Sequence, residues 1–341
     1  MLSPLIQRYL TDNVTLARLL PVIQPMRLQS QWSSIFGLLM LAVTPIFPMS
    51  VRIDTSVTQP VLIGTPIGLS ASVSEAGPGA IWYRYRIRTP DGNTFRTVRD
   101  FSPVAGFEWV PAQFEGTYQI EVTARNRDSG DSTETTSSVE IAPRVTDDQP
   151  VLTATRNELV FLYSSPPCAE GGKLRVQYDA PDGFRQFTPY INCVAGRNIN
   201  VYLAGLRAET HYNIRQLVTT GEGVEEGPAL DLITGTPSVL PKNTVAVQKP
   251  QGKIGQGVLL QSKVFEFNVA TDLDGNLIWY APSGIRYLTR PEPGGYFFAL
   301  IQKDDGADYD QILRQIDLAG STVFETNAAR INEQLDALGK I

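Results

Sequence analysis

The chain has 341 residues, with 29 lysine and arginine residues against 35 aspartate and glutamate residues, so its formal net charge is −6. At roughly 100–200 residues per domain, this length allows two to three domains. Hydrophobic residues make up 42% of the sequence and charged residues 19%, which is enough for packed cores. The acidic balance disfavours a nucleic-acid partner, which would need a basic face. It does not exclude a small anionic substrate, because the local field of a pocket can oppose the net charge.

An uncharged apolar stretch lies near the N-terminus. It covers the fifteen residues 35–49, IFGLLMLAVTPIFPM. A membrane-spanning helix needs about 20 apolar residues, whereas a signal-peptide core has this shorter length and follows a basic residue, here Arg27. We interpret residues 1–50 as a leader, either a signal peptide or an anchor, with Met26 as the true start. The sequence therefore predicts an exported protein, periplasmic or extracellular, which meets a membrane only through this leader.

Strand-like runs broken by Gly, Pro, Asp and Asn follow the leader, as is typical of sandwiches and barrels. Residues 51–147 form the first predicted module, an immunoglobulin- or PKD-like sandwich. Alternation along the run 80–88 places Tyr85 and Ile87 on one face together with Ile81 and Tyr83. A hairpin turn is predicted at Asp91-Gly92, and later strands are predicted at residues 116–127 and 137–141.

Residues 148–237 form the second predicted module, a fibronectin type III-like sandwich. Leu206, Thr210 and Tyr212 have the spacing of a tyrosine corner, in which the tyrosine hydroxyl bonds to backbone near the start of its strand. This pattern makes Tyr212 a structural residue. Further strands are predicted at residues 158–163, 173–178 and 198–206.

The two cysteines, Cys168 and Cys193, both fall in the second module, 25 positions apart (193 − 168). An exported domain oxidises such a pair, and closing this loop would contribute roughly 3 kcal/mol. The alternative is a pair of buried thiols, because sequence does not define the separation of the two Cα atoms. Two cysteines and one distant histidine cannot complete a four-ligand zinc site.

Other polar residues carry weaker signals. The only histidine, His211, is surrounded by no Ser, Cys or carboxylate constellation, so we predict no catalytic role for it. The sequence thus predicts no catalytic, cofactor-binding or metal-binding residue. Two further sets of charged residues could mark an anion patch and a cation site. We interpret both as solvated surfaces instead. They are Arg84, Arg86 and Arg88 on one strand face, and Lys303, Asp304, Asp305, Asp308 and Asp310 in one loop.

Residues 238–341 contain a short internal repeat. DLDGNLIW (272–279) matches DLAGSTVF (317–324) at an offset of 45 residues (317 − 272), which lies within the length range of β-propeller blades. In each copy the glycine would occupy a positive-φ turn position and the aromatic residue would pack between blades. The alternative is a chance similarity of two hairpins. Residues 326–341 predict a terminal helix with Gly339 as its C-cap.

The length of this third region allows only two blades. It has 104 residues (341 − 238 + 1), whereas at least four blades of about 45 residues close a propeller. Two blades alone would leave strand edges unpaired. We therefore expect an all-β chain of two tandem sandwiches followed by the first blades of an incomplete propeller.

Several segments resemble the bacterial arylsulfotransferase (aryl-sulfate sulfotransferase) family, over roughly residues 150–341. In the propeller they are ATDLDGNLIWY (270–280), IRYLTRPEPGGYFFAL (285–300), ILRQIDLAGSTVFET (312–326) and ARINEQLDALGK (329–340). In the second module they are PPCAEGGKLRVQY (166–178), Cys193 and NVYLAGLRAETHY (200–212).

This resemblance implies a six-bladed propeller that transfers a sulfuryl group from a phenolic sulfate ester to a phenol through a sulfohistidine, without a cofactor. None of the family's catalytic histidines maps onto this sequence, so the catalytic part is expected beyond Ile341 and this chain alone is expected to be inactive. Two other readings are a non-enzymatic extracytoplasmic binding or adhesion protein, and a quinone-dependent propeller enzyme.

Overall fold

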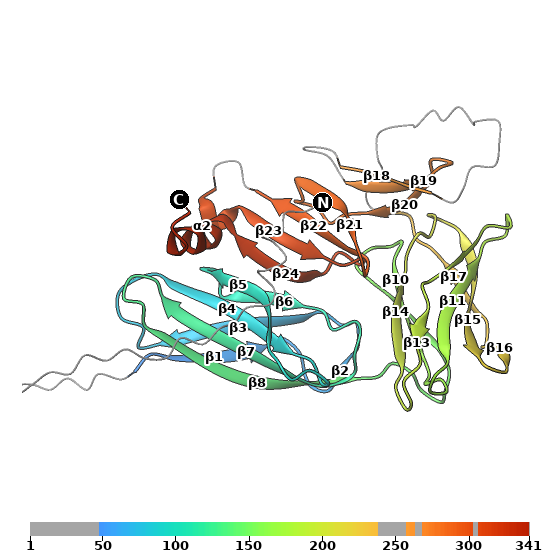
Figure 1. Cartoon of the computed structure of the whole chain (residues 1–341), viewed down its shortest axis with the longest axis horizontal. Helices are drawn as coiled ribbons and strands as arrows, with labels where there is room; N and C mark the ends of the chain where they lie inside the picture. Colours follow the sequence, from blue (N-terminus) through green and yellow to red (C-terminus); the bar gives the residue numbers. More distant parts are fainter. Residues whose placement is uncertain (1–47, 238–256, 263–267, 303–305, 341) are drawn as a thin grey trace, which may run out of the picture. The chain divides into compact units, whose positions relative to one another are not determined.

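The computed structural model describes residues 48–237, 257–262, 268–302 and 306–340, all within one compact unit (Figure 1). The predicted leader up to residue 47, Met26 included, lies outside the described residues, as do Lys303, Asp304 and Asp305 of the acidic loop. The described part is mostly β, with several antiparallel sheets. This confirms the predicted predominance of strands.

The first sandwich is formed by two sheets. One has the order β1-β3-β6, and the other begins β2-β8-β7-β4-β5. Apolar side chains of both sheets form one buried cluster, which includes Tyr85 and Ile87 as the alternation predicts, and both are at most 5% exposed. The strands are β1 (Ser50–Thr55), β2 (Val61–Leu62), β3 (Ile67–Ser74), β4 (Ile81–Arg88), β5 (Arg96–Ser102), β6 (Gly106–Trp109), β7 (Gly116–Asn126) and β8 (Ser132–Ala142).

The second sandwich has a three-stranded sheet, β14-β10-β9, and a six-stranded sheet centred on β11 and β15. Its core surrounds Tyr163 and Tyr212, both fully buried. The Tyr212 hydroxyl accepts a hydrogen bond of 2.9 Å from the backbone N–H of Arg207, which confirms the predicted tyrosine corner. The strands are β9 (Val151–Ala154), β10 (Phe161–Ser165), β11 (Lys173–Asp179), β12 (Arg185–Phe187), β13 (Ile191–Asn192), β14 (Ile199–Leu203), β15 (His211–Thr220), β16 (Gly223–Glu226) and β17 (Leu230–Ile233).

The third region contains a three-stranded sheet, β18-β19-β20, and a four-stranded antiparallel meander, β21 to β24. Between β22 and β23 lies a short 3-10 turn, η1 (Asp308–Asp310). No closed ring of blades is formed in the part of the chain that the structure describes, so the propeller stays a prediction. The strands are β18 (Val258–Gln261), β19 (Val269–Asp272), β20 (Leu277–Tyr280), β21 (Tyr287–Glu292), β22 (Tyr296–Ile301), β23 (Ile312–Ile316) and β24 (Thr322–Asn327).

One edge of the meander is covered by the first sandwich. Strand β24 lies parallel to β5 and pairs with it at Glu325 and Arg99, so a single nine-stranded sheet runs through both parts (Figure 1). The expectation that the third region would leave its strand edges unpaired is therefore wrong at β24. The physical reason is that the first sandwich supplies the backbone partner for this edge.

The terminal helix, α2 (Ala328–Ala337), is capped by hydrogen bonds at both ends. The side chain of Asn327 accepts from the backbone N–H of Arg330 at the N-terminus. At the C-terminus Gly339 has φ +62°, and the N–H groups of Gly339 and Lys340 donate to Asp336 and Leu335. This is a Schellman motif, which confirms Gly339 as the residue that ends the helix.

Candidate functional site

The two copies of the repeat adopt the same hairpin. In each copy the aspartate Oδ1 accepts a bond of 2.8 Å from the backbone N–H four residues later, Asn276 or Ser321. The glycines have φ +88° at Gly275 and φ +82° at Gly320, as predicted. A β-bulge also occurs at equivalent positions, Ala270/Thr271 and Gln315/Ile316. The sequence repeat is thus a repeat of backbone conformation.

The aromatic residue of the repeat has a different place in each copy. Trp279 is 4% exposed, stacks on Phe297 of the meander at 4.8 Å, and donates its Nε1–H to the carbonyl of Leu318. It therefore packs between the two sheets of the third region, and its packing between propeller blades stays a prediction. Phe324 in the second copy is only partly buried, because its strand β24 turns towards β5.

Both repeat turns contact the second sandwich through the second oxygen of their aspartate. Arg207 donates from Nε to Asp272 Oδ2 at 2.9 Å and from Nη1 to Asp182 at 2.7 Å. The hydroxyl of Tyr202 donates to Asp317 Oδ2 at 3.0 Å. The repeat therefore supplies two equivalent docking points for the same sandwich. The repeat identified these two aspartates in the sequence. No sequence pattern pointed to their partners, Arg207 and Tyr202.

Apolar residues reinforce this docking. The β9–β10 turn of the second sandwich buries Leu159 and Val160 completely, each in a cluster formed mainly by third-region side chains. Asn157 of the same turn donates from Nδ2 to the carbonyl of Tyr280 at 2.8 Å. Since the turn places two apolar side chains in a neighbouring core, the second sandwich is an integral part of the third region's packing.

A crevice of about 150 Å³ lies where the two sandwiches and the third region meet. Tyr202 contributes to its lining from the second sandwich, and Ala319 and Ser321 contribute from the second repeat turn. Gly64 and Pro66 of the first sandwich also line it. The crevice thus borders the Tyr202–Asp317 contact.

Charged residues join the third region to the first sandwich. Arg99 Nε lies 3.0 Å from Glu325 Oε1, and Arg314 binds the other carboxylate oxygen at 2.7 Å. The side chains of Arg99 and Glu325 are 6% and 8% exposed, and burial lowers the pKa of Arg99. Asn327 donates from Nδ2 to the carbonyl of Phe101 at 2.8 Å. Two cations therefore share one buried carboxylate at the β5–β24 junction.

Helix α2 adds a second ionic group to this junction. Glu333 accepts from Arg125 of the first sandwich at 2.9 Å and pairs with Arg330 at 2.7 Å, and Arg330 in turn lies 3.2 Å from Asp100. These arginines lower the pKa of Glu333 to about 2. The guanidinium groups of Arg125 and Arg330 also lie over the ring of Phe101.

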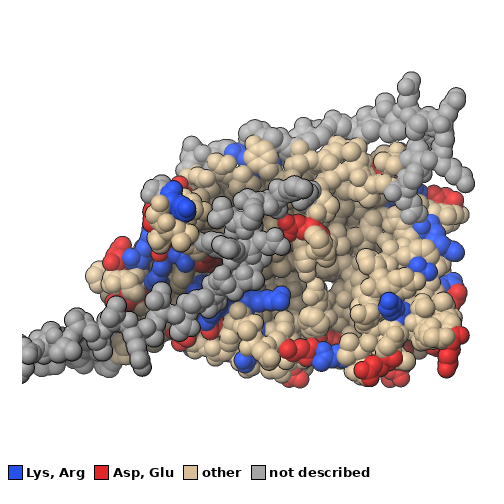
Figure 2. All heavy atoms as spheres, viewed as in Figure 1, with Lys and Arg blue, Asp and Glu red and all other residues tan. Residues whose placement is uncertain are grey.

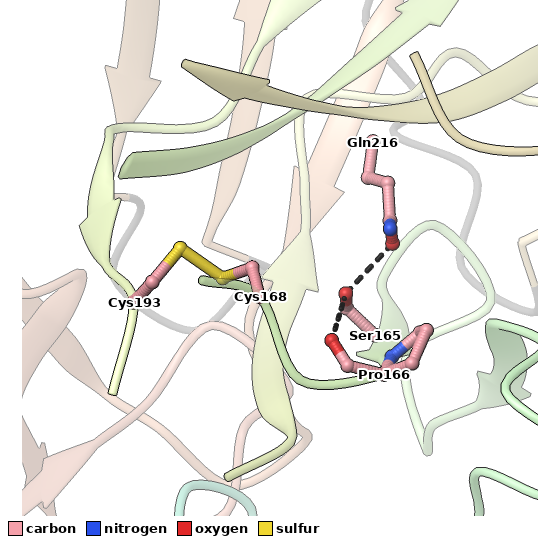
Figure 3. The surroundings of a disulfide bond; sticks show 5 residues. All are labelled: Ser165, Pro166, Cys168, Cys193 and Gln216. Atoms are coloured by element: carbon pink, nitrogen blue, oxygen red, sulfur yellow. Dashed lines mark hydrogen bonds between the residues drawn. A yellow bond between two sulfur atoms is a disulfide. The ribbon is translucent and has the colours of Figure 1, made fainter. Parts of the chain in front are cut away.

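The two cysteines form a disulfide, with Cα atoms 5.5 Å apart. Figure 3 shows its surroundings, in which the Ser165 hydroxyl lies 2.7 Å from Gln216 Oε1 and 2.8 Å from the carbonyl oxygen of Pro166. The bond joins the segment before β11 to the one after β13. Because oxidising compartments preserve such bonds, the disulfide indicates an extracytoplasmic protein.

His211 begins β15 on an exposed face, with Nε2 3.2 Å from Asp231 of β17. Within the described residues no hydroxyl or thiol nucleophile bonds to this histidine, and no group of three or more His, Cys, Asp or Glu side chains could hold a metal ion. Asp308 and Asp310, the described members of the acidic loop, form the 3-10 turn η1.

The arginines of β4 are mostly engaged by neighbours. Arg86 forms a bidentate pair with Glu121, Arg84 donates to Thr123 at 3.1 Å, and Arg88 lies over Phe95 at 5.2 Å. Acidic and basic side chains are interspersed on the face drawn in Figure 2. This arrangement resembles a structural ladder of charges and rings more than an open anion site.

No protein-family model and no curated protein matches the sequence. Among solved structures, the FN1–FN3 domains of chicken CNTN1 align at 14% identity over 52% of this chain and 65% of theirs, with a TM-score of 0.22. A two-domain fibronectin type III segment of chicken tenascin aligns at 19% identity over 54% and 98%, with a TM-score of 0.22. Purple acid phosphatase PPD1 from yellow lupin aligns at 9% identity over 54% and 41%, with a TM-score of 0.23. Scores this low support no statement about activity.

No described helix combines the length and the apolar character that a bilayer crossing would require.

Proposed function

We propose that this chain is the scaffold of an exported arylsulfotransferase, in which an immunoglobulin-like and a fibronectin type III-like sandwich hold the first blades of a propeller. The observation that supports it best is the repeated hairpin, which has the offset of propeller blades and binds the second sandwich through Asp272 and Asp317. The four-stranded meander of β21 to β24 has the strand count of one blade.

We assign sulfuryl transfer to residues that are not among these 341. The family uses a histidine as the sulfuryl carrier, whereas His211 lies on an exposed face of the second sandwich beside Asp231. A phenolic sulfate ester would be the donor and a phenol the acceptor. The transferring group carries negative charge that needs clustered cations near the nucleophile, whereas Nε2 of His211 lies 3.2 Å from a carboxylate, that of Asp231.

The test is an assay of two preparations with p-nitrophenyl sulfate as donor and phenol as acceptor. The purified 341-residue chain should release no p-nitrophenol above a heat-denatured blank. The product of the whole reading frame that contains this sequence should transfer the sulfuryl group to phenol. Absence of turnover in the whole product, or turnover by the 341-residue chain alone, would overturn the proposal.

A binding or adhesion role is the second candidate, and one surface of the second sandwich favours it. Arg175 lies over the rings of Phe187 and Tyr190 at 4.0 and 4.9 Å, and these rings are 39% and 51% exposed. Exposed aromatic and arginine side chains are enriched at binding surfaces. An inactive whole product that binds an extracellular ligand, and loses binding on replacement of Phe187 and Tyr190 by alanine, would favour this candidate.

A further inference from the structure

Each repeat turn presents an aspartate carboxylate to the second sandwich, but the two carboxylates face partners of different charge. Asp272 faces the cation Arg207, with Nε and Oδ2 2.9 Å apart. Asp317, at the equivalent position, faces only the neutral hydroxyl of Tyr202, 3.0 Å away. The turns are otherwise alike in hydrogen bonds, glycine conformation and bulge position. The molecule therefore contains an internal control for the effect of the partner.

Asp317 is a buried carboxylate without a cationic partner in the described part of the chain. It is 8% exposed, and its hydrogen-bond donors are Tyr202 of β14 and the backbone of its own turn, including Ser321. Among the described residues, Tyr296 of β22 is a further titratable group near this contact, and it acts on Tyr202. An ionised carboxylate in such a place loses hydration that no positive charge replaces.

Burial raises the pKa of Asp317 to about 6, against an ordinary value of 3.8. Burial together with the negative charge of Asp317 also raises the pKa of Tyr202, so this tyrosine keeps its proton and remains a donor. Because the folded-state pKa of Asp317 exceeds its unfolded value, the folded chain binds a proton that the unfolded chain releases. Stability should therefore fall as pH rises from about 4 through 6.

The crevice described above borders two residues that bond to this carboxylate. Tyr202 and Ser321, both of which bond to Asp317, line the crevice, and its volume of about 150 Å³ has room for several waters. Gly64 and Pro66, which also line the crevice, belong to the first sandwich. Hydration of Asp317 would therefore act where all three parts of the chain meet.

We propose that the Asp317–Tyr202 contact is a proton-controlled latch between the third region and the second sandwich. It is closed while Asp317 carries a proton, and it loosens when the carboxylate ionises and draws water from the crevice. The Arg207–Asp272 ion pair does not involve Asp317, so the loosening is confined to the second repeat turn. This inference does not depend on the proposed enzymatic function.

The test is the unfolding equilibrium of the full chain between pH 4 and 7, measured in urea for the wild type, Asp317→Asn and Asp272→Asn. Relative to Asp317→Asn, the wild-type unfolding constant should rise roughly 50-fold across this range. The matched control Asp272→Asn should be less stable than the wild type yet keep the same rise.

A direct titration of the wild type covers the case in which a variant fails to fold. The carboxyl carbon of Asp317, followed by NMR in the folded chain, should titrate with a midpoint near 6. Tyr202→Phe removes a donor to the ionised form and should move this midpoint upward. A midpoint at or below 4, or an Asp317→Asn protein with the pH profile of the wild type, would overturn the latch.

Discussion

At the scale of single residues, the buried carboxylate of Glu325 is the most consequential group at the junction of the first sandwich and the third region. It faces Arg99 and Arg314, and its side chain is 8% exposed. Removing one partner of a buried ion pair costs more than the pair contributes, because the remaining charge stays buried without compensation. Here the loss would leave two guanidinium groups without their counter-charge.

We expect Glu325→Gln to lower the free energy of unfolding by about 3 kcal/mol, as judged by urea denaturation. The matched control is Asp54→Asn, which removes the carboxylate of the exposed Arg52–Asp54 pair and should change stability by about 0.5 kcal/mol or less. Equal effects of the two substitutions would show that the Glu325 carboxylate does not hold the junction.

The tyrosine corner yields a second expectation. Tyr212→Phe removes the acceptor of the Arg207 backbone N–H, and an unpaired buried donor costs about 1–2 kcal/mol. Chemical denaturation of this variant should show that loss. Tyr190→Phe, which removes a hydroxyl from a ring that is 51% exposed, should leave stability unchanged. A Tyr212→Phe protein as stable as the wild type would contradict the structural role of the corner.

The ionic group on α2 predicts acid sensitivity. Arg125 and Arg330 lower the pKa of Glu333 to about 2 from its ordinary 4.5, so the stability it contributes is present above pH 4.5 and is lost as pH falls towards 2. Melting temperatures of the wild type and Glu333→Gln should differ above pH 4.5 and converge near pH 2. Asp336→Asn, on an exposed position of the same helix, should follow the wild type throughout. A constant gap between the wild type and Glu333→Gln would contradict this reading.

At the scale of elements, the repeated hairpin depends on glycine in its turn. Gly320 has φ +82°, and a Cβ there would lie 2.5 Å from Cγ of Pro282. The chain therefore needs glycine both for the backbone conformation and for the close contact with the segment that follows β20.

Gly320→Ala should destabilise the chain by more than about 2 kcal/mol, because conformational strain and steric overlap both act. Gly130→Ala distinguishes the conformational strain from the steric overlap, since Gly130 has φ +81° but no atom within 4 Å of an added Cβ. This control should show only the strain, about 1–2 kcal/mol. Equal melting temperatures of the two variants would mean that the Pro282 contact has no energetic role.

Local patterns were sufficient to predict many elements. Alternation predicted strands β4 and β7, residue spacing predicted the Tyr212 corner, and Gly339 marked the end of α2, because each feature depends on neighbouring residues. The last strand of the first module was predicted at residues 137–141, whereas β8 begins at Ser132, where several threonines suit a strand.

Contacts between distant segments left no such pattern. The pairing of β24 with β5 involves one residue pair, Glu325 and Arg99, and the sequence of neither strand predicts it. Trp82 lies on the same strand face as the β4 arginines and is nevertheless 2% exposed, because it joins Phe101 and Ala329 in a cluster. The partners of Asp272 and Asp317 likewise depended on how the second sandwich packs.

At the scale of the whole molecule, the three parts share cores and backbone pairing. Leu162 of the second sandwich belongs to the buried cluster of the first, and Val160 belongs to that of the third region. Strand β24 continues a sheet of the first sandwich. Shared buried clusters couple the stability of one part to that of the next, so we expect these parts to unfold together rather than as independent domains.

Native-state hydrogen exchange in increasing urea tests this coupling most directly. We expect the amides of β5, β14 and β24 to converge on one opening free energy as urea rises, since the third region cannot detach without exposing buried groups of both sandwiches. If β24 opened at a clearly lower free energy while β5 and β14 kept their full protection, the third region would be an independent unit and the proposed scaffold would be contradicted.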